Sequence, residues 1–312
     1  MKTLRTTFKL IAFGLASLFY SCSEPDVAPV VPPVELVAEE KPSYPPKTEV
    51  KFSIKDEDFE IVVDEMIGKG FVPSYIDGFL HQKVAKVETL FNIIFKEDEK
   101  AHECKYFYGL NESGLKATID IMSKTHNLVF LESYPQDDKI LFAAIFKTGI
   151  PTQFHAELKI PYNEWQDTFD QMTEFGYRMA CRSTVREGNT WFVSALFDKT
   201  PIGGWVAFAS LAPDAMMTKI EEQYEKGKSV SHFDVLQETP YEYTFGAIFS
   251  TTDAPIMKEI DMTSVILADN IDSAAKSGYV LQTLSAYDIK VFNADYTFHY
   301  EVRYVATWKS SK

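Results

Sequence analysis

Two short motifs in the chain could form a serine nucleophile site. Ser113-Gly114-Leu115-Lys116 has the SxxK spacing, which places a lysine amine one helical turn after a serine, where it can accept the hydroxyl proton. Lys147-Thr148-Gly149 matches the Lys-Thr-Gly triplet on the opposite wall of such sites. Together the two motifs would predict a serine hydrolase acting on a peptide or cell-wall substrate.

The context of these motifs favours a different interpretation. Only 31 residues separate Lys116 from Lys147, whereas most of a catalytic domain intervenes in the enzymes that combine the two elements. A second SxxK occurs at 273–276, and serine and lysine are common enough that about one or two chance matches are expected in such a chain. We therefore expect no catalytic residue and keep the hydrolase as the alternative hypothesis.

Other reactive side chains form no recognisable site in the sequence. The histidines at 155, 232 and 299 lie in strand-like runs without a recurring acidic or nucleophilic partner, and no HExxH or CxxC spacing exists. A zinc or acid–base site assembled from several repeats stays open, but the sequence predicts no metal and no cofactor. The acidic pairs 137–138 and 221–222 are interpreted as solvated charge.

The N-terminus has the pattern of an export signal. Residues 1–21 combine three basic residues with an apolar run that is too short to span a bilayer. Phe19-Tyr20-Ser21-Cys22 resembles a lipobox, so we expect a lipoprotein signal peptide over 1–21 and lipid attachment at Cys22. The alternative is an ordinary secretory signal with an incidental cysteine.

The segment after Cys22 predicts a spacer rather than a folded domain. Residues 22–47 are rich in proline and acidic residues and can bury little apolar surface. Loss of the signal peptide would change the net charge from −14 to −17, which argues against nucleic acid as a partner. We expect a chain held at a membrane by its lipid anchor, in the cell envelope and at the outer membrane, on either face.

The remaining cysteines allow two interpretations. Cys104 and Cys181 could pair in an oxidising envelope. Each also lies in an apolar, strand-like context, which favours two buried free thiols.

Residues 48–312 repeat one pattern five times. An apolar run ending in an aromatic residue recurs, and its copies end 51, 51, 52 and 59 positions apart. Helix-terminating residues and the apolar residues that end the strand before each helix keep nearly the same intervals. The copies of the run are 92–95, 143–146, 194–197, 246–249 and 305–308; the helix stops are Gly70, Asn127, Gly176, Gly227 and Gly278; the strand ends are Ile54, Leu110, Ile160, Leu211 and Met262.

The pattern within a repeat predicts an α+β fold. Leu115, Ile119 and Met122 lie on one face of a helix in the second unit, as do Trp165, Phe169 and Met172 in the third. After the second-unit helix come β-rich runs at 128–134 and 140–147, and a third run at 154–160 leads into the next helix. We predict one helix and a three-stranded antiparallel meander per repeat, stacked as a propeller-like ring or an open arc. The approximate repeats are 48–101, 102–151, 152–201, 202–253 and 254–312.

Aromatic residues make up 14% of the chain and could supply a platform for sugar rings. Trp165, Trp205 and Trp308 occur at repeat positions where a core needs bulk, so we predict that they pack inside. The last repeat has extra aromatic-rich length over 288–309, which favours a cap on an exposed edge over a binding loop.

Three motifs resemble a known bacterial tandem repeat, which also occurs before the catalytic domain of polyglycine hydrolases. Residues 205–212 (WVAFASLA) are similar to its WxARHGLT motif, 176–178 (GYR) to its GYR, and 142–146 (FAAIF) to its YAAIW strand. The family's histidine position is occupied by Tyr108, Lys159 and Ala209 in the three clear repeats, so no role of that histidine is carried over.

In polyglycine hydrolases the chemistry belongs to a separate serine hydrolase domain, and the present sequence ends with the fifth repeat. The resemblance therefore implies a repeat scaffold without the enzyme. We expect a non-catalytic binding or scaffold module for a protein or glycan partner of the envelope.

Overall fold

The computed structural model describes residues 47–311, except 84–85, 99, 150–152, 201–202, 240–241 and 253. The expected signal peptide, Cys22 and all but the last residue of the spacer lie outside the described residues. Within the described part of the chain, no helix combines the length and apolar character needed to cross a bilayer.

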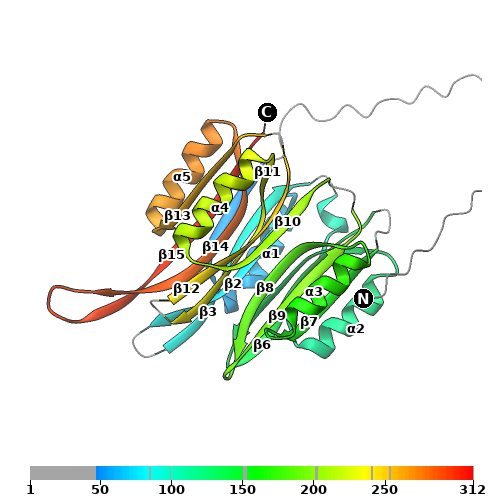
Figure 1. Ribbon diagram of the computed structural model, residues 1–312, viewed down its shortest axis with the longest axis horizontal. Helices are drawn as coiled ribbons and strands as arrows, with labels where there is room; N and C mark the ends of the chain where they lie inside the picture. Colours follow the sequence, from blue (N-terminus) through cyan, green and yellow to red (C-terminus); the bar gives the residue numbers. More distant parts are fainter. Residues whose placement is uncertain are drawn as a thin grey trace, which may run out of the picture. The chain divides into compact units, whose positions relative to one another are not determined.

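The described chain contains five copies of the order strand, helix, strand, strand (Figure 1). The first strands are β1 (Thr48–Lys55), β4 (Lys105–Leu110), β7 (Phe154–Pro161), β10 (Trp205–Leu211) and β13 (Ile256–Met262). The helices are α1 (Phe59–Gly68), α2 (Glu112–Met122), α3 (Trp165–Glu174), α4 (Pro213–Glu225) and α5 (Ser264–Lys276). The second strands are β2 (Phe71–Lys83), β5 (Asn127–Gln136), β8 (Arg178–Glu187), β11 (Lys228–Thr239) and β14 (Tyr279–Phe292). The third strands are β3 (Lys86–Glu97), β6 (Lys139–Lys147), β9 (Thr190–Asp198), β12 (Glu242–Thr251) and β15 (Phe298–Ser310).

Each copy forms one three-stranded antiparallel sheet, as predicted, but the strand order is not that of a meander. The third strand lies between the first and the second in all five sheets. The run at 154–160, for example, pairs with β9 of the following sheet and not with β6. The helix carries the chain across the sheet from the first to the second strand, which leaves the central place for the third strand.

The central strand explains why its short motif is the most regular feature of the sequence. Ile93, Ile94 and Phe95 of β3 are completely buried, and so are residues 143–146 of β6. A strand with neighbours on both sides and a helix over one face tolerates little but apolar side chains. The predicted helix stripes are confirmed at α1 and α3, where Phe59, Val63 and Met66, and Trp165 and Met172, are buried.

The second strands carry the contacts between neighbouring repeats. β2 contacts β5, β5 contacts β8, β8 contacts β11, and β11 contacts β14. β14 also contacts β2, so the fifth repeat packs against the first. Ser53 of β1 accordingly exchanges a 2.7 Å hydrogen bond with the Tyr304 hydroxyl of β15.

The extra length of the last repeat does not cover an exposed edge. It extends the β14–β15 hairpin, which projects away from the five sheets in Figure 1. Three aromatic residues at its tip, Phe292, Tyr296 and Phe298, are exposed. Because β14 and β15 already contact β2, the predicted cap is wrong.

Each first strand contains a β-bulge with one residue in the left-handed region. The strand register shifts near the end of every first strand, and φ is positive at Ser53, Gly109, Lys159, Ser210 and Asp261. Four of the five repeats thus place a side chain where glycine fits best. The bulge turns the end of the strand toward the helix that follows.

We predict that Gly109→Ala lowers the free energy of unfolding by about 1 kcal/mol, the cost of an alanine in the left-handed region. A Cβ atom at Gly109 (φ +69°) would meet nothing within 4 Å, so the loss would come from the backbone alone. Gly68→Ala is the matched control, because that helical position is equally open and alanine should add up to about 1 kcal/mol there. Urea unfolding measures both, and stabilisation by Gly109→Ala would contradict the role of the bulge.

Candidate functional site

The residues of the SxxK motif are engaged in ordinary surface contacts at the start of α2. The Ser113 hydroxyl donates to the Asn111 side chain at 2.9 Å, beside the helix cap that Asn111 forms with the Gly114 N–H. The Lys116 amine pairs with Glu112 at 2.7 Å and lies on an exposed surface. No contact joins Ser113 to Lys116 among the described residues.

The Lys-Thr-Gly triplet lies at the other end of the same sheet. Leu110, just before α2, lies opposite Phe142 at the start of β6, whereas Lys147 ends that strand. Five residues of strand correspond to roughly 16 Å. Lys147 pairs instead with Asp98 at 3.2 Å, so the structure does not bring the two motifs together.

The histidines and cysteines do not form a reactive cluster. Cys104 and Cys181 are buried free thiols, and burial raises their pKa values to about 11 and about 12. Burial lowers the pKa of His232 to about 4, and its Nε2 donates to the Arg182 carbonyl. Within the described residues, no three His, Cys, Asp or Glu side chains are arranged to hold a metal ion.

The predicted core role of the tryptophans is confirmed at Trp165 and Trp308, which are buried. Trp205 is half-buried and packs edge-on against Phe169. These rings therefore do not form an exposed sugar platform.

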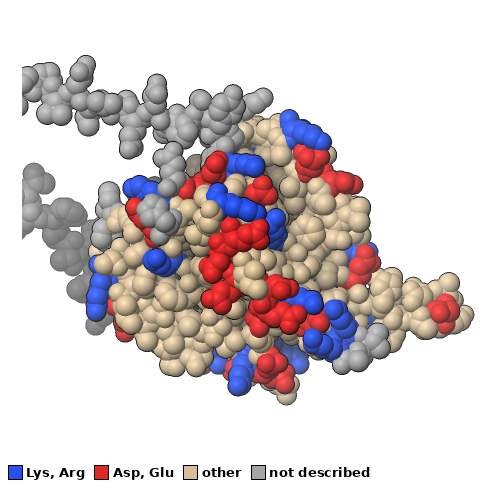
Figure 2. All heavy atoms as spheres, turned by 180° about the vertical axis from the view of Figure 1, so that it is seen from behind, with Lys and Arg blue, Asp and Glu red and all other residues tan. Residues whose placement is uncertain are grey.

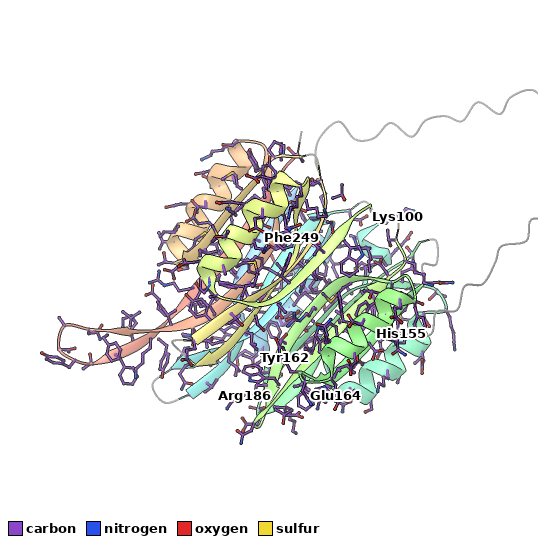
Figure 3. All side chains as sticks on the ribbon, viewed as in Figure 1. Lys100, His155, Tyr162, Glu164, Arg186 and Phe249 are labelled. Carbon is purple, nitrogen blue, oxygen red and sulfur yellow. The ribbon has the colours of Figure 1, made fainter. Side chains whose placement is uncertain are left out.

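The main candidate site is a cavity of about 420 Å³ between the second strands of all five sheets. Its lining mixes apolar side chains with several charged ones, although strands at the centre of a domain are usually apolar. Each second strand contributes a charged side chain: Asp77 of β2, Glu132 of β5, Arg182 and Arg186 of β8, Asp234 of β11 and Asp288 of β14; Asp138 of the turn after β5 also lines the cavity. Arg186 lies at the same end of the third sheet as Tyr162 and Glu164, and His155 lies at the opposite end (Figure 3).

Five of the lining and adjoining residues occupy one equivalent position in the repeats. The short apolar motif of each third strand (92–95, 143–146, 194–197, 246–249 and 305–308) is here called the central-strand motif. Each of the five residues pairs with the first residue of this motif in its own sheet. All five are polar: Asp77, Glu132, Ser183, Asp234 and Ser285. Two residues earlier, the rings of Tyr75, Phe130 and His232 pack together. The Tyr75 hydroxyl donates to the Phe233 carbonyl at 2.7 Å, which links the first repeat to the fourth.

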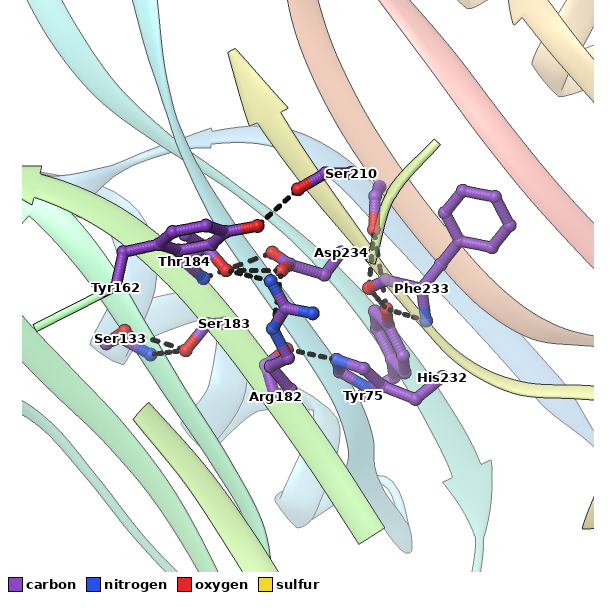
Figure 4. Close-up of polar contacts among 11 residues, drawn as sticks. Tyr75, Ser133, Tyr162, Arg182, Ser183, Thr184, Ser210, His232, Phe233 and Asp234 are labelled. Carbon is purple, nitrogen blue, oxygen red and sulfur yellow. Dashed lines mark hydrogen bonds and ion pairs between the residues drawn. The ribbon is translucent and has the colours of Figure 1, made fainter. Parts of the chain in front are cut away.

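Arg182 and Asp234 form a buried ion pair in a small network (Figure 4). Arg182 Nε lies 3.5 Å from Asp234 Oδ2, and its guanidinium donates to the Thr184 hydroxyl at 2.9 Å. Thr184 in turn donates to Asp234 through its hydroxyl at 2.7 Å and its backbone N–H at 3.2 Å. Gly246 leaves room for the guanidinium, because a Cβ there would lie 3.3 Å from Arg182 Nη1.

Asp77 and Glu132 lack a cationic partner among the described residues. Asp77 Oδ2 accepts from the Asn92 side chain at 2.8 Å and the Ala286 N–H at 3.0 Å. Asp77 is partly accessible where it borders the cavity. The protein around its carboxyl group nevertheless excludes most of the water, and this desolvation raises the pKa of Asp77 to about 7. Burial, together with the nearby Asp77 and Asp234 carboxylates, raises the pKa of Glu132 well above its usual range.

Sequence reasoning missed this site because it searched for catalytic motifs and paired carboxylates. The acidic pair 137–138 forms the turn between β5 and β6, and Glu221 on α4 pairs with Lys258. The available signal was a single charged residue inside an apolar strand, seven residues after the helix stops Gly70 and Gly227 and five after Asn127. Asp77, Glu132 and Asp234 each fit that description.

Residues 152–200 match the family model of the polyglycine hydrolase-like structural repeat. This segment is the third repeat, β7 to β9, so the resemblance proposed from the sequence motifs is confirmed there. No curated protein matches the chain.

We predict that Asp77→Asn flattens the pH dependence of stability. The pKa of Asp77 rises from 3.8 to about 7 on folding, so the folded protein holds this proton while the unfolded chain loses it. Stability therefore falls as the pH rises from about 4 to about 7, by up to about 1.4 kcal/mol per pH unit for one proton.

Urea unfolding between pH 4.5 and 7.5 tests this prediction. Asp77→Asn should gain stability relative to the native chain as the pH rises, whereas Asp120→Asn on the exposed surface of α2 serves as the control. If Asp77→Asn changed the free energy of unfolding by the same amount at pH 4.5 and at pH 7.5, the raised pKa of Asp77 would be contradicted.

Proposed function

We propose that this chain is a non-catalytic binding module of the bacterial cell envelope and that its central cavity receives part of a protein or glycan ligand. The observation that carries the proposal is the cavity itself, about 420 Å³ in volume and lined by all five second strands. A scaffold without a ligand would need polar side chains there only to pair the edges of the second strands, and buried charge beyond that need is costly. Charges kept in such a place are typical of binding sites.

We further propose that the five sheets close into a propeller-like ring around this cavity. The contact of β14 with β2 and the hydrogen bond between Ser53 and Tyr304 support closure. In a closed ring the polar position of each second strand faces a shared centre. Side chains from repeats far apart in the sequence can then bind one ligand.

Attachment to a membrane through Cys22 remains part of the proposal. The basic start, the short apolar run and the Ser21-Cys22 pair support it. The proline-rich segment 23–47 would then hold the repeats clear of the lipid surface.

The experiment for the binding function blocks the cavity without altering the outer surface. Val235 lines the cavity and is only partly buried, so Val235→Trp should fill the space. Val265→Trp places the same side chain on the exposed face of α5. Thermal unfolding with a panel of peptidoglycan fragments, oligosaccharides and peptides measures binding, because a ligand that binds only the folded state raises Tm.

We expect at least one panel ligand to raise Tm of the native chain and of Val265→Trp but not of Val235→Trp. Ligands that raise Tm of Val235→Trp as much as that of the native chain would refute the cavity as the binding site.

The anchor has its own test in detergent phase partition of the protein expressed in a Gram-negative host. We expect the native chain in the detergent phase and Cys22→Ala in the aqueous phase, since two or more acyl chains are needed for stable anchoring. Ser23→Ala should behave as the native chain. Detergent partition of Cys22→Ala would contradict lipid attachment.

A further inference from the structure

We propose that the central cavity binds an organic ammonium group of its ligand and that Glu132 is the principal acceptor. The inference rests on the proposed function, in which the cavity is the ligand site, and it specifies the chemistry that the cavity recognises.

Glu132 is the buried carboxyl group of the cavity with the fewest partners. Its side chain is only 7% exposed, and the backbone N–H of Gly78 donates to it. No cation and no donating side chain contacts it among the described residues. A buried carboxyl group with free acceptor positions is costly unless a ligand completes its hydrogen bonds.

Two other buried carboxylates of the cavity, Asp234 and Asp288, are already satisfied. Asp288 binds the His81 ring at 2.9 Å and accepts the Gln82 N–H at 2.5 Å. Asp234 is held by Arg182 and Thr184. These contacts leave Glu132 as the group in greatest need of a partner.

The balance of charge in the cavity favours a cation over an anion. Five carboxyl groups line the cavity, at Asp77, Glu132, Asp138, Asp234 and Asp288, against two basic side chains, of which Arg182 is buried and Arg186 is exposed. Arg182 lies within 3.5 Å of Asp234, so its charge is compensated there. Among the described lining residues, Arg186 is then the one cation without a carboxylate partner, and because it is exposed, the buried part of the cavity offers an anion no free counter-ion.

Arg182 also offers one place for an acceptor beside the ammonium site. Its Nε is buried and makes no hydrogen bond among the described residues. Arg182 is 3% exposed and lines the cavity. A ligand that carries a carbonyl or hydroxyl oxygen near its amine would satisfy both groups at once.

A groove of about 530 Å³ adjoins the cavity and shares Leu80, Val87, Pro135, Asp138 and Arg186 with it. Acidic residues outnumber basic ones along the groove: Asp56, Glu57, Glu88, Asp137 and Asp138 against Lys55, Lys86 and Arg186. Figure 2 shows Asp and Glu side chains gathered near the middle of one face of the molecule. An acidic approach and a net charge of −14 would attract cations and repel anions.

The ammonium group suits this site because it is a compact donor of three hydrogen bonds. Burial raises the pKa of Glu132 well above its usual range, and the Asp77 and Asp234 carboxylates raise it further. A bound ammonium ion would lower that pKa again, so binding should release a proton from Glu132 to the solvent. A neutral ligand of the same shape would release none.

Isothermal titration calorimetry of the full chain at pH 7.5 tests the proposal with two matched pairs of probes. Nα-acetyl-lysine amide is compared with Nα-acetyl-norleucine amide, and glucosamine with glucose. We expect the charged member of at least one pair to bind and the neutral member not to bind. Which pair responds tells whether the amine belongs to a peptide or to a glycan. Repeating the titration in buffers of different ionisation enthalpy should reveal proton release.

Glu132→Gln keeps the shape of the group and carries no charge into the buried site, so it should fold. It should bind the amine about tenfold more weakly or worse, because a hydrogen bond to a charged group contributes on the order of 1.5–3 kcal/mol. Glu174→Gln on the exposed surface of α3 is the control and should bind as the native chain does.

Equal binding of charged and neutral probes, unchanged affinity of Glu132→Gln, or no binding of either amine would overturn the ammonium site. If a ligand of another class still depends on Val235 in the thermal assay, the cavity keeps its binding role and only the ammonium inference fails. If Val235→Trp leaves the binding of every ligand unchanged, the proposed binding function of the cavity is refuted, and the ammonium inference is refuted with it.

Discussion

The inner edge of each second strand carries backbone groups that its own sheet leaves unpaired, and side chains of neighbouring second strands bind them. The second strand is an edge strand in every sheet, and a buried edge must find partners for its N–H and C=O groups. The Ser133 N–H donates to the Ser183 hydroxyl at 2.7 Å, and the Thr184 N–H donates to Asp234 at 3.2 Å. The Ala286 N–H donates to Asp77 at 3.0 Å, where the last repeat meets the first.

This constraint explains why the centre of the domain is polar. Each junction needs a side chain that can reach a backbone group of another repeat, and a polar side chain that donates or accepts hydrogen bonds can do so. Leu131 and Cys181 show the same exchange with sulfur, since the thiol accepts from the Leu131 N–H and donates to its carbonyl at 3.3 Å. The cavity and its charges arise at the place where the five edges approach one another. Function, in our proposal, uses the polar groups that remain after the edges are satisfied.

Packing around the edges limits how the repeats can vary. A Cβ at Gly78 would lie 2.6 Å from the Tyr134 Cβ, so the first and second repeats approach too closely there for any other residue. The same close approach brings the Gly78 N–H to Glu132. The identity of one glycine thus helps to hold the acid that we assign to ligand binding.

The sequence by itself determined the repeat, its helix and its strands, because burial acts locally. The central-strand motif at 143–146 must be apolar on both faces, and Trp165 and Met172 must share one face of a helix, whatever surrounds them. The strand order was not determined, because residues 154–160 are equally suited to pair with β6 or β9, and only packing in three dimensions selects β9. The cavity was decided by the tertiary structure alone, since Asp77, Glu132 and Asp234 are more than 50 residues apart and become neighbours only when five second strands bring their unpaired edges together.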